Sequence, residues 1–259
     1  MTSLGEAFEK ARADGRAALI GYLPAGFPSV TGAVDGIRAM IAGGVDVIEV
    51  GLPYSDPLMD GPTIQRAVDQ ALSGGVRTAD VLRTVEAVAG TGVPVLVMTY
   101  WNPILQYGVP RFAADLAAAG GAGLITPDLT PEEAGDWLAA AGETGLAPVF
   151  LVAPSSTDER ISRVAGLCRG FIYAASTMGV TGTRDQVSDR APALVARVRA
   201  ATQLPVGVGL GVSDGAQAAQ VATYADGVIV GSAFVRAAAA GLTAVEALAA
   251  DLAAGVRCR

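Results

Sequence analysis

Residues 18–50 read ALIGYLPAGFPSVTGAVDGIRAMIAGGVDVIEV, and this stretch decides the fold. An apolar run at Ala18–Leu23 is followed by a helical stretch at Val30–Ala42 and then by a second apolar run at Val45–Val50. Short runs rich in Val, Ile and Leu without polar alternation are typical of parallel strands that are buried on both faces. Serine before the helical stretch and glycine after it are common at helix ends. The stretch therefore predicts a strand–helix–strand unit.

The same unit recurs along the chain. Eight apolar runs are present, at Ala18–Leu23, Val45–Val50, Val93–Tyr100, Ala122–Thr126, Ala147–Val152, Gly170–Ala174, Pro205–Gly209 and Asp226–Val230. Helical stretches between them include Val30–Ala42, Pro110–Ala118, Pro131–Thr144, Asp158–Leu167, Arg190–Ala201 and Asp214–Thr223. Because no linker or composition break interrupts the alternation, we expect one α/β domain over residues 1–259, a (β/α)₈ TIM barrel. An open doubly wound sheet is the alternative.

An extra helix is predicted before the first strand. In Ser3–Ala13, the apolar residues Leu4, Phe8 and Ala11 recur at helical spacing. We expect this helix to close one end of the barrel.

The composition indicates a protein with a large buried core. Hydrophobic residues make up 51% of the 259 residues and charged residues 17%, which excludes disorder as the main state. No run reaches the roughly 18 apolar residues of a membrane span, and the charged start does not match a secretory signal, so we expect a cytoplasmic protein. The net charge is −7 and Lys and Arg do not cluster, which argues against nucleic acid and membrane surfaces as partners.

Missing residue types restrict the possible chemistry. The chain has no histidine, which excludes Ser-His-Asp and Cys-His catalysis and zinc sites that rely on histidine. Its one lysine, Lys10, precedes the first strand and is poorly placed for a Schiff base. Cys168 and Cys258 have no metal-ligand spacing and are expected to be reduced thiols. We predict no metal site, and proton transfer falls to Asp, Glu, Tyr, Ser, Thr or Cys.

Carboxylates gather where the second predicted strand ends. Chemistry in such barrels lies at the carboxyl ends of the strands. Glu49 lies in the last part of that strand, so it points either into the barrel mouth or into the helix layer, where it would need an arginine partner. From the residues alone, the catalytic and the ion-pair interpretations of Glu49 stand equal. Asp56 fits a turn role in the following loop, whereas Asp60 is a candidate second carboxylate.

Glycine and serine follow the last two predicted strands. Backbone N–H groups at such positions can bind phosphate without a lysine, and barrel enzymes frequently bind phosphate after strands seven and eight. The candidates are Gly209, Gly211, Ser213, Gly231 and Ser232. Residues 176–189, after strand six, form a connection longer than usual, which indicates either a lid or a plain surface loop.

Aromatic and apolar residues occupy most of the other strand ends. The aromatic and apolar residues are Tyr22, Met98, Tyr100, Ile125, Leu151 and Tyr173, and the few polar ones include Asn102 and Asp128. Each could pack at the rim, but together they describe a mouth suited to a flat apolar ligand.

The stretch EVGLPYSDPLMDGPTIQ at 49–65 resembles the tryptophan synthase α-subunit family. Further matches are GYLPAGFPS (21–29), TYWNPILQYG (99–108), TPDLTPEE (126–133), STMGVTGTR (176–184), GVGLGVS (207–213) and GSAFV (231–235). The resemblance implies that Glu49 and Asp60 are the catalytic pair and that Thr181 closes a lid over Asp60. It also implies an indole pocket that includes Tyr22 and Tyr173, and a phosphate site at Gly182, Gly211, Gly231 and Ser232. Met59 and Leu210 depart from the family's usual residues, in the loop and beside the indole.

The family's reaction is the retro-aldol cleavage of indole-3-glycerol phosphate to indole and glyceraldehyde 3-phosphate. It implies no cofactor in this chain, and a β subunit with pyridoxal phosphate as partner in an α-β-β-α heterotetramer. Two rivals remain, a cofactor-free barrel isomerase acting on a sugar phosphate and a silent regulatory subunit. The isomerase leaves the second carboxylate and the apolar mouth unexplained, and the presence of Glu49 and Asp60 argues against the silent subunit.

Overall fold

Eight parallel strands form a closed barrel in the computed structural model, which describes residues 3–175, 190–209 and 211–257. The strands pair in chain order, and β1 also pairs with β8, which closes the ring. Their bounds are β1 Ala18–Pro24, β2 Val47–Gly51, β3 Val95–Met98, β4 Gly123–Thr126, β5 Ala147–Val152, β6 Ile172–Ala175, β7 Val206–Gly209 and β8 Gly227–Val230. The predicted barrel is confirmed, and the open sheet is wrong.

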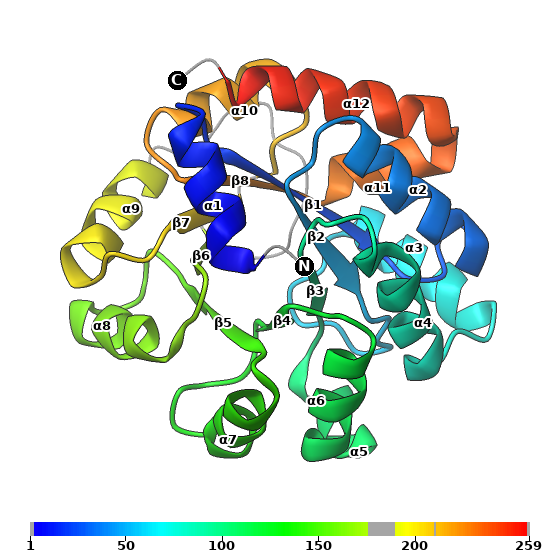
Figure 1. Ribbon diagram of the computed structural model, residues 1–259, viewed down its shortest axis with the longest axis horizontal. Coiled ribbons are helices and arrows are strands. Elements are labelled where there is room, and N and C mark those ends of the chain that lie inside the picture. Colours follow the sequence, from blue (N-terminus) through cyan, green and yellow to red (C-terminus); the bar gives the residue numbers. More distant parts are fainter. Residues whose placement is uncertain (1–2, 176–189, 210, 258–259) are drawn as a thin grey trace.

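Helices surround the barrel, as Figure 1 shows. In the described chain they are α1 Leu4–Ala13, α2 Val30–Ala42, α3 Pro62–Ser73, α4 Thr78–Ala89, α5 Trp101–Tyr107, α6 Val109–Ala118, α7 Gly135–Thr144, α8 Asp158–Leu167, α9 Arg190–Ala201, α10 Gly215–Ala222, α11 Ser232–Ala240 and α12 Leu242–Gly255. The predicted bounds of α2, α8 and α9 are confirmed. α7 begins four residues later than predicted, because residues 130–133 form a turn in which the Glu133 N–H donates to the Thr130 carbonyl.

The barrel has an inner and an outer apolar layer. The inner cluster includes Ile20, Val47 and Phe171, and the outer cluster packs the helices onto the strands. Along β2, Val47 belongs to the inner cluster, whereas Ile48 and Val50 belong to the outer one. Alternate residues of each strand therefore face the barrel axis.

Helix α1 lies across one end of the barrel in Figure 1, in front of the strands and inside the outline formed by the other helices. A capping box starts it, because the Glu6 N–H donates to the Ser3 hydroxyl and the Ser3 N–H donates to the Glu6 carboxylate. Its Phe8 ring lies 5.2 Å from the Phe171 ring at the bottom of the barrel interior, measured between ring centroids. The predicted N-terminal helix is thus confirmed, and it closes the end opposite to the carboxyl ends of the strands.

A buried ion pair joins the amino ends of the first two strands. Two Arg16 nitrogens donate to the two oxygens of Asp46, at 2.6 and 2.8 Å, and the Leu19 N–H donates to the same carboxylate at 2.8 Å. Removing one partner from such a buried pair typically costs about 3–5 kcal/mol. This end of β2 therefore contributes to stability.

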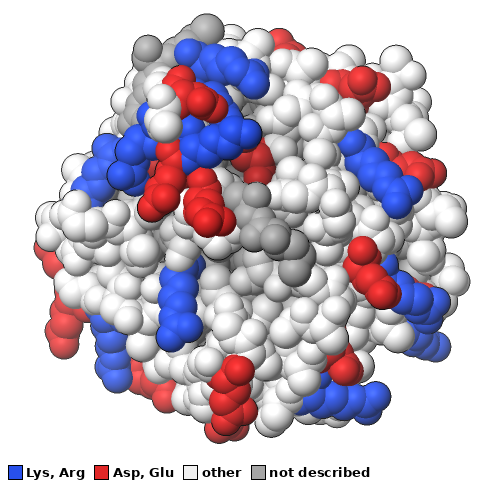
Figure 2. Space-filling model, viewed as in Figure 1, with Lys and Arg blue, Asp and Glu red and all other residues white. Residues whose placement is uncertain are grey.

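Charges of both signs mix on the face that Figure 1 presents. Figure 2 shows the densest group over α1, where acidic and basic side chains lie side by side, and no broad basic field on this face. Among the described residues, no helix has the length and apolar character needed to span a bilayer.

Candidate active site

A cavity opens at the carboxyl ends of the strands, opposite to α1. Its walls come from β1, β2, β3, β5, β6, β7 and β8, and from α3 and the first turn of α11. The lining residues are Tyr22, Glu49, Leu52, Met59, Asp60, Ile64, Val68, Met98, Thr99, Tyr100, Pro127, Leu151, Tyr173, Ala175, Gly209, Gly211, Ile229, Gly231 and Ser232. Most of this surface is apolar, with carboxyl and phenol groups at a few points, as is usual in ligand sites.

Glu49 is a buried acid without a partner. It lies on the inner face of β2 and is 0% exposed. Neither of its carboxyl oxygens has a hydrogen-bond partner in the part of the chain that the structure describes. Burial alone raises its pKa to about 8, so the neutral acid predominates at pH 7. The ion-pair interpretation of Glu49 is therefore not supported by any described arginine, and Arg16, which precedes β1, pairs with Asp46 instead.

Asp60 is held at the cavity wall by the loop between β2 and α3. The Tyr100 hydroxyl donates to its Oδ1 at 3.0 Å and accepts from the Met59 N–H at 3.1 Å. The Gln65 side-chain amide donates to the Asp60 carbonyl at 2.8 Å. Burial raises the pKa of Asp60, and the hydrogen bond from Tyr100 opposes that rise. One phenol thus fixes both the loop backbone and the carboxylate.

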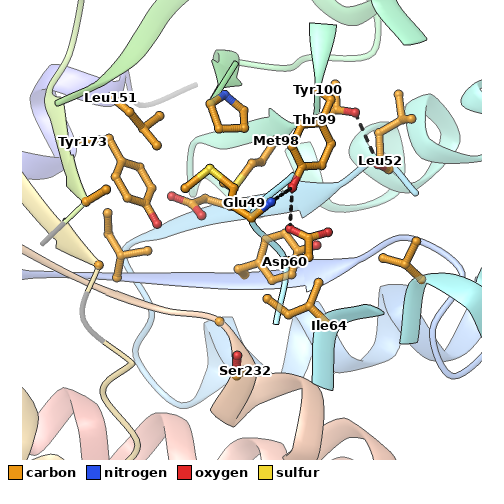
Figure 3. Close-up of a pocket in the computed structure, with 18 of the residues that line it drawn as sticks. Glu49, Leu52, Asp60, Ile64, Met98, Thr99, Tyr100, Leu151, Tyr173 and Ser232 are labelled. Atoms are coloured by element: carbon orange, nitrogen blue, oxygen red, sulfur yellow. Dashed lines mark hydrogen bonds between the residues drawn. The ribbon is translucent and has the colours of Figure 1, made fainter. Parts of the chain in front are cut away.

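Both acids line the cavity, Glu49 from β2 and Asp60 from the loop that follows this strand. Figure 3 shows the Glu49 carboxylate between Tyr173 and Leu151 on one side and Asp60 with Tyr100 on the other. Burial, and then the nearby acids, raise the pKa of Tyr173 well above its ordinary value. The Tyr173 hydroxyl lies over β7, where a Cβ on Gly209 would come within 2.7 Å of its oxygen. Glycine at that position makes room for the phenol.

The β7 and β8 ends carry the features of an anion site. Gly211 has a left-handed backbone with φ of 74°, and Gly231 precedes the first residue of α11, Ser232. The first N–H groups of a helix have no partner within the helix and attract negative charge. Glycine before them lets a ligand approach the backbone closely. This part of the cavity can bind a phosphate without a cationic side chain.

Comparisons with known proteins agree over almost the whole chain. The family model for the tryptophan synthase alpha chain matches residues 8–257. The chain belongs to the tryptophan synthase alpha chain family. It is 62% identical to the tryptophan synthase alpha chain of Nocardia farcinica, covering 98% of this chain and 96% of that protein, and 64% identical to that of Salinispora arenicola, covering 99% and 98%. A chain from the structure of Mycobacterium tuberculosis tryptophan synthase is 60% identical, with 99% of both chains covered and a TM-score of 0.95.

Most of the residues predicted to bind the ligand lie in the cavity wall. For the indole pocket these are Tyr22, Met98, Tyr100, Leu151 and Tyr173, and for the phosphate site Gly211, Gly231 and Ser232. Ile125 is fully buried in the inner cluster, beside Met98 in the strand register, and does not line the cavity. Thr181, Gly182 and Leu210 lie outside the described residues, as does the predicted lid at 176–189. The roles of these residues stay predictions.

Three polar residues predicted at the rim support loops of the tryptophan synthase fold. Asp56 is exposed and accepts from the Ser55 hydroxyl, in keeping with a turn. The Asp128 carboxylate accepts from the Trp101 N–H at 2.9 and 3.0 Å and so caps α5. Asn102 donates to the Tyr54 hydroxyl.

Several cavity residues were not predicted from the sequence. They are Leu52, Ile64, Val68, Thr99, Pro127, Ala175 and Ile229. Two of them carry a signal that was available, because Ala175 follows Tyr173 and Ile229 precedes Gly231 at the two-residue spacing of one strand face. Ile64 and Val68 are four residues apart on α3, which places both on one face of that helix. No local pattern indicates that α3 reaches over the cavity.

Proposed function

We propose that this chain cleaves indole-3-glycerol phosphate to indole and glyceraldehyde 3-phosphate, as the α subunit of tryptophan synthase in tryptophan biosynthesis. Family membership supports this activity. The observation that carries it is the Glu49 carboxyl, which is fully buried, has no described partner and lines the cavity, with a pKa of about 8. Such an acid can both give and take a proton near neutral pH.

Glu49 performs both proton transfers of the reaction. Its neutral carboxyl protonates indole C3, and the positive charge that forms is shared with the ring nitrogen. The resulting carboxylate takes the proton of the glycerol hydroxyl next to the ring. The C–C bond then breaks, its electrons return to the ring, and the alkoxide becomes the aldehyde. Glu49 ends protonated as it began, and each positioned transfer contributes roughly 10²–10⁴-fold.

Asp60 stabilises the charge that develops on the ring. Its carboxylate accepts a hydrogen bond from the indole N–H, which becomes more acidic when C3 is protonated. The Tyr100 hydrogen bond holds the carboxylate in place for this contact. Preorganised partners of this kind are most effective in a site with little water.

The cavity has an apolar part and an anion-binding part, which correspond to the indole ring and the phosphate of the substrate. Apolar residues of β3 and β5, with Tyr173 of β6, form a wall for the indole ring, and the glycines and Ser232 at β7 and β8 suit the phosphate. An isomerase acting on a sugar phosphate alone would have no use for that apolar wall.

The proposed reaction needs no cofactor in this chain, because two carboxylates supply all the proton transfer and charge stabilisation. We expect a β subunit with pyridoxal phosphate as the partner that consumes indole, in an α-β-β-α heterotetramer. The structures named for Mycobacterium tuberculosis tryptophan synthase support such an assembly. A cytoplasmic location fits the proposal, since phosphorylated metabolites do not cross membranes freely.

Indole release tests the function. The purified chain is given indole-3-glycerol phosphate with and without a β subunit, and indole is quantified. The parent should release indole and Glu49→Gln should lose at least about 100-fold in kcat, because the amide cannot shuttle a proton. Glu132→Gln, which changes an exposed carboxylate on an arginine pair, is the matched control and should keep parental activity. Parental turnover by Glu49→Gln would refute the proposed mechanism.

A further inference from the structure

One phenol in the cavity has no part in the mechanism above. Tyr22 lies on β1, and its Cα is the register partner of Glu49 on β2. Its side chain leans along the strand over Gly51, where an added Cβ would come within 2.7 Å of Cζ and still closer to the hydroxyl oxygen. The residue on β2 that follows Glu49 on the same face is therefore a glycine that makes room for the end of this ring.

The other end of the Tyr22 ring lies beside the anion site. A Cβ on Gly231 would come within 3.5 Å of Cδ1 and 3.7 Å of Cβ of Tyr22. The ring thus extends from Gly231 at the end of β8 to Gly51 at the end of β2, with the hydroxyl at the β2 end. It runs from the phosphate end of the cavity to the end of β2, the strand that carries Glu49.

The Tyr22 hydroxyl is a donor at the cavity wall with no acceptor among the described residues. The residue is 8% exposed and lines the cavity. No hydrogen bond joins its hydroxyl to any residue in 3–175, 190–209 or 211–257. Burial, and then Asp60 and neighbouring groups, raise its pKa well above the ordinary value, so the hydroxyl keeps its proton. A buried hydroxyl without a partner costs free energy unless a ligand or water satisfies it.

We propose that the Tyr22 hydroxyl hydrogen-bonds a glycerol hydroxyl of the substrate and makes the site specific for a hydroxylated chain between ring and phosphate. This inference rests on the proposed function. The three-carbon chain of the substrate must bridge the two ends that the Tyr22 ring also bridges. The phosphate is not the acceptor, because the ring's Cβ end, and not its hydroxyl, lies at Gly231. The Tyr22 ring borders the indole pocket, but its hydroxyl lies at Gly51 of β2, whereas the apolar wall for the indole ring comes from β3, β5 and β6.

A pair of ligands separates this role from simple packing. Tyr22→Phe keeps the ring and removes only the hydroxyl. Two quantities are measured for parent and variant: kcat/KM for indole-3-glycerol phosphate, and calorimetric Kd for 3-(indol-3-yl)propyl phosphate, which has the ring and the phosphate but no glycerol hydroxyls. One hydrogen bond lost in a buried site corresponds to about a tenfold change. We expect kcat/KM to fall about tenfold and the Kd of the propyl phosphate to stay within twofold.

The control is Tyr224→Phe, which removes a buried phenol hydroxyl outside the cavity and should change neither quantity. Unchanged kcat/KM in Tyr22→Phe would overturn the proposal. An equal loss for both ligands would also overturn it, because the ring's packing would then explain the effect. Neither result would touch the proposed function, which fails only if the parent itself releases no indole.

Discussion

Glu49→Gln should stabilise the folded protein at alkaline pH while it removes activity. The folded chain holds the Glu49 proton with a pKa of about 8, whereas the ordinary value for the unfolded chain is 4.5. The folded state therefore binds this proton more tightly, so the stability that the Glu49 proton contributes is fully present below pH 4.5 and is lost as the pH rises to about 8. Each pKa unit corresponds to 1.36 kcal/mol, so the loss is on the order of 5 kcal/mol above pH 8.

This loss of stability is large compared with a typical unfolding free energy of about 5–15 kcal/mol. The glutamine side chain of the variant cannot ionise, so the variant does not lose this stability as the pH rises. Urea unfolding of parent and variant from pH 5 to pH 9, followed by the fluorescence of Trp101 and Trp137, measures the difference. We expect the unfolding free energy of the variant, relative to that of the parent, to rise by about 1.4 kcal/mol for each pH unit between 5 and 8. Above pH 8 this difference should stay constant.

Glu132→Gln serves as the control of opposite sign. Hydrogen bonding to Arg160 lowers the pKa of Glu132, so this carboxylate contributes stability above its ordinary pKa and loses it only in acid. Its variant should differ from the parent by a constant amount between pH 5 and 9. A constant difference for Glu49→Gln as well would refute the conclusion that Glu49 is buried as an unpaired acid.

Three further results follow from the site and the fold. The pH profile of kcat/KM should fall above about pH 8, because Glu49 starts the reaction protonated; a profile that rises through pH 9.5 contradicts that order of steps. Tyr100→Phe removes the donor to Asp60 and should lower kcat roughly tenfold with little change in the thermal midpoint, as initial rates and calorimetry would show. Phe8→Ala leaves a cavity under Phe171 and should cost about 3–5 kcal/mol in urea unfolding, with a small loss contradicting the role of α1 as a packed end cap.

Periodicity was sufficient to predict the fold. Eight buried runs alternating with helical stretches give the barrel, because parallel strands buried on both faces leave a pattern in local sequence. The predicted start of α7 was wrong by four residues, because the local sequence pattern there was misleading. Pro131 and the acidic residues after it resemble a helix start. In the structure, however, the Glu133 N–H donates to the Thr130 carbonyl in a turn, and the helix begins only after it.

The site was predictable in its residues and not in its contacts. The spacing of β2 left Glu49 facing either the mouth or the helices, and only the absence of a described partner in three dimensions favours one of them. The bond from Tyr100 to Asp60 joins residues 40 positions apart on different strands and loops, for which sequence provides no local signal. The same holds for the room that Gly51 makes for Tyr22.

The packing of α1 against the barrel determines where products can leave. Below the cavity, the interior is filled by the inner cluster, and Phe8 covers its far end. Both products must therefore depart through the mouth by which the substrate entered. A protein that takes indole directly from this chain therefore has to receive it over the carboxyl ends of the strands, where the cavity opens. A receiver attached to the α1 side would collect only indole that had first escaped into bulk water.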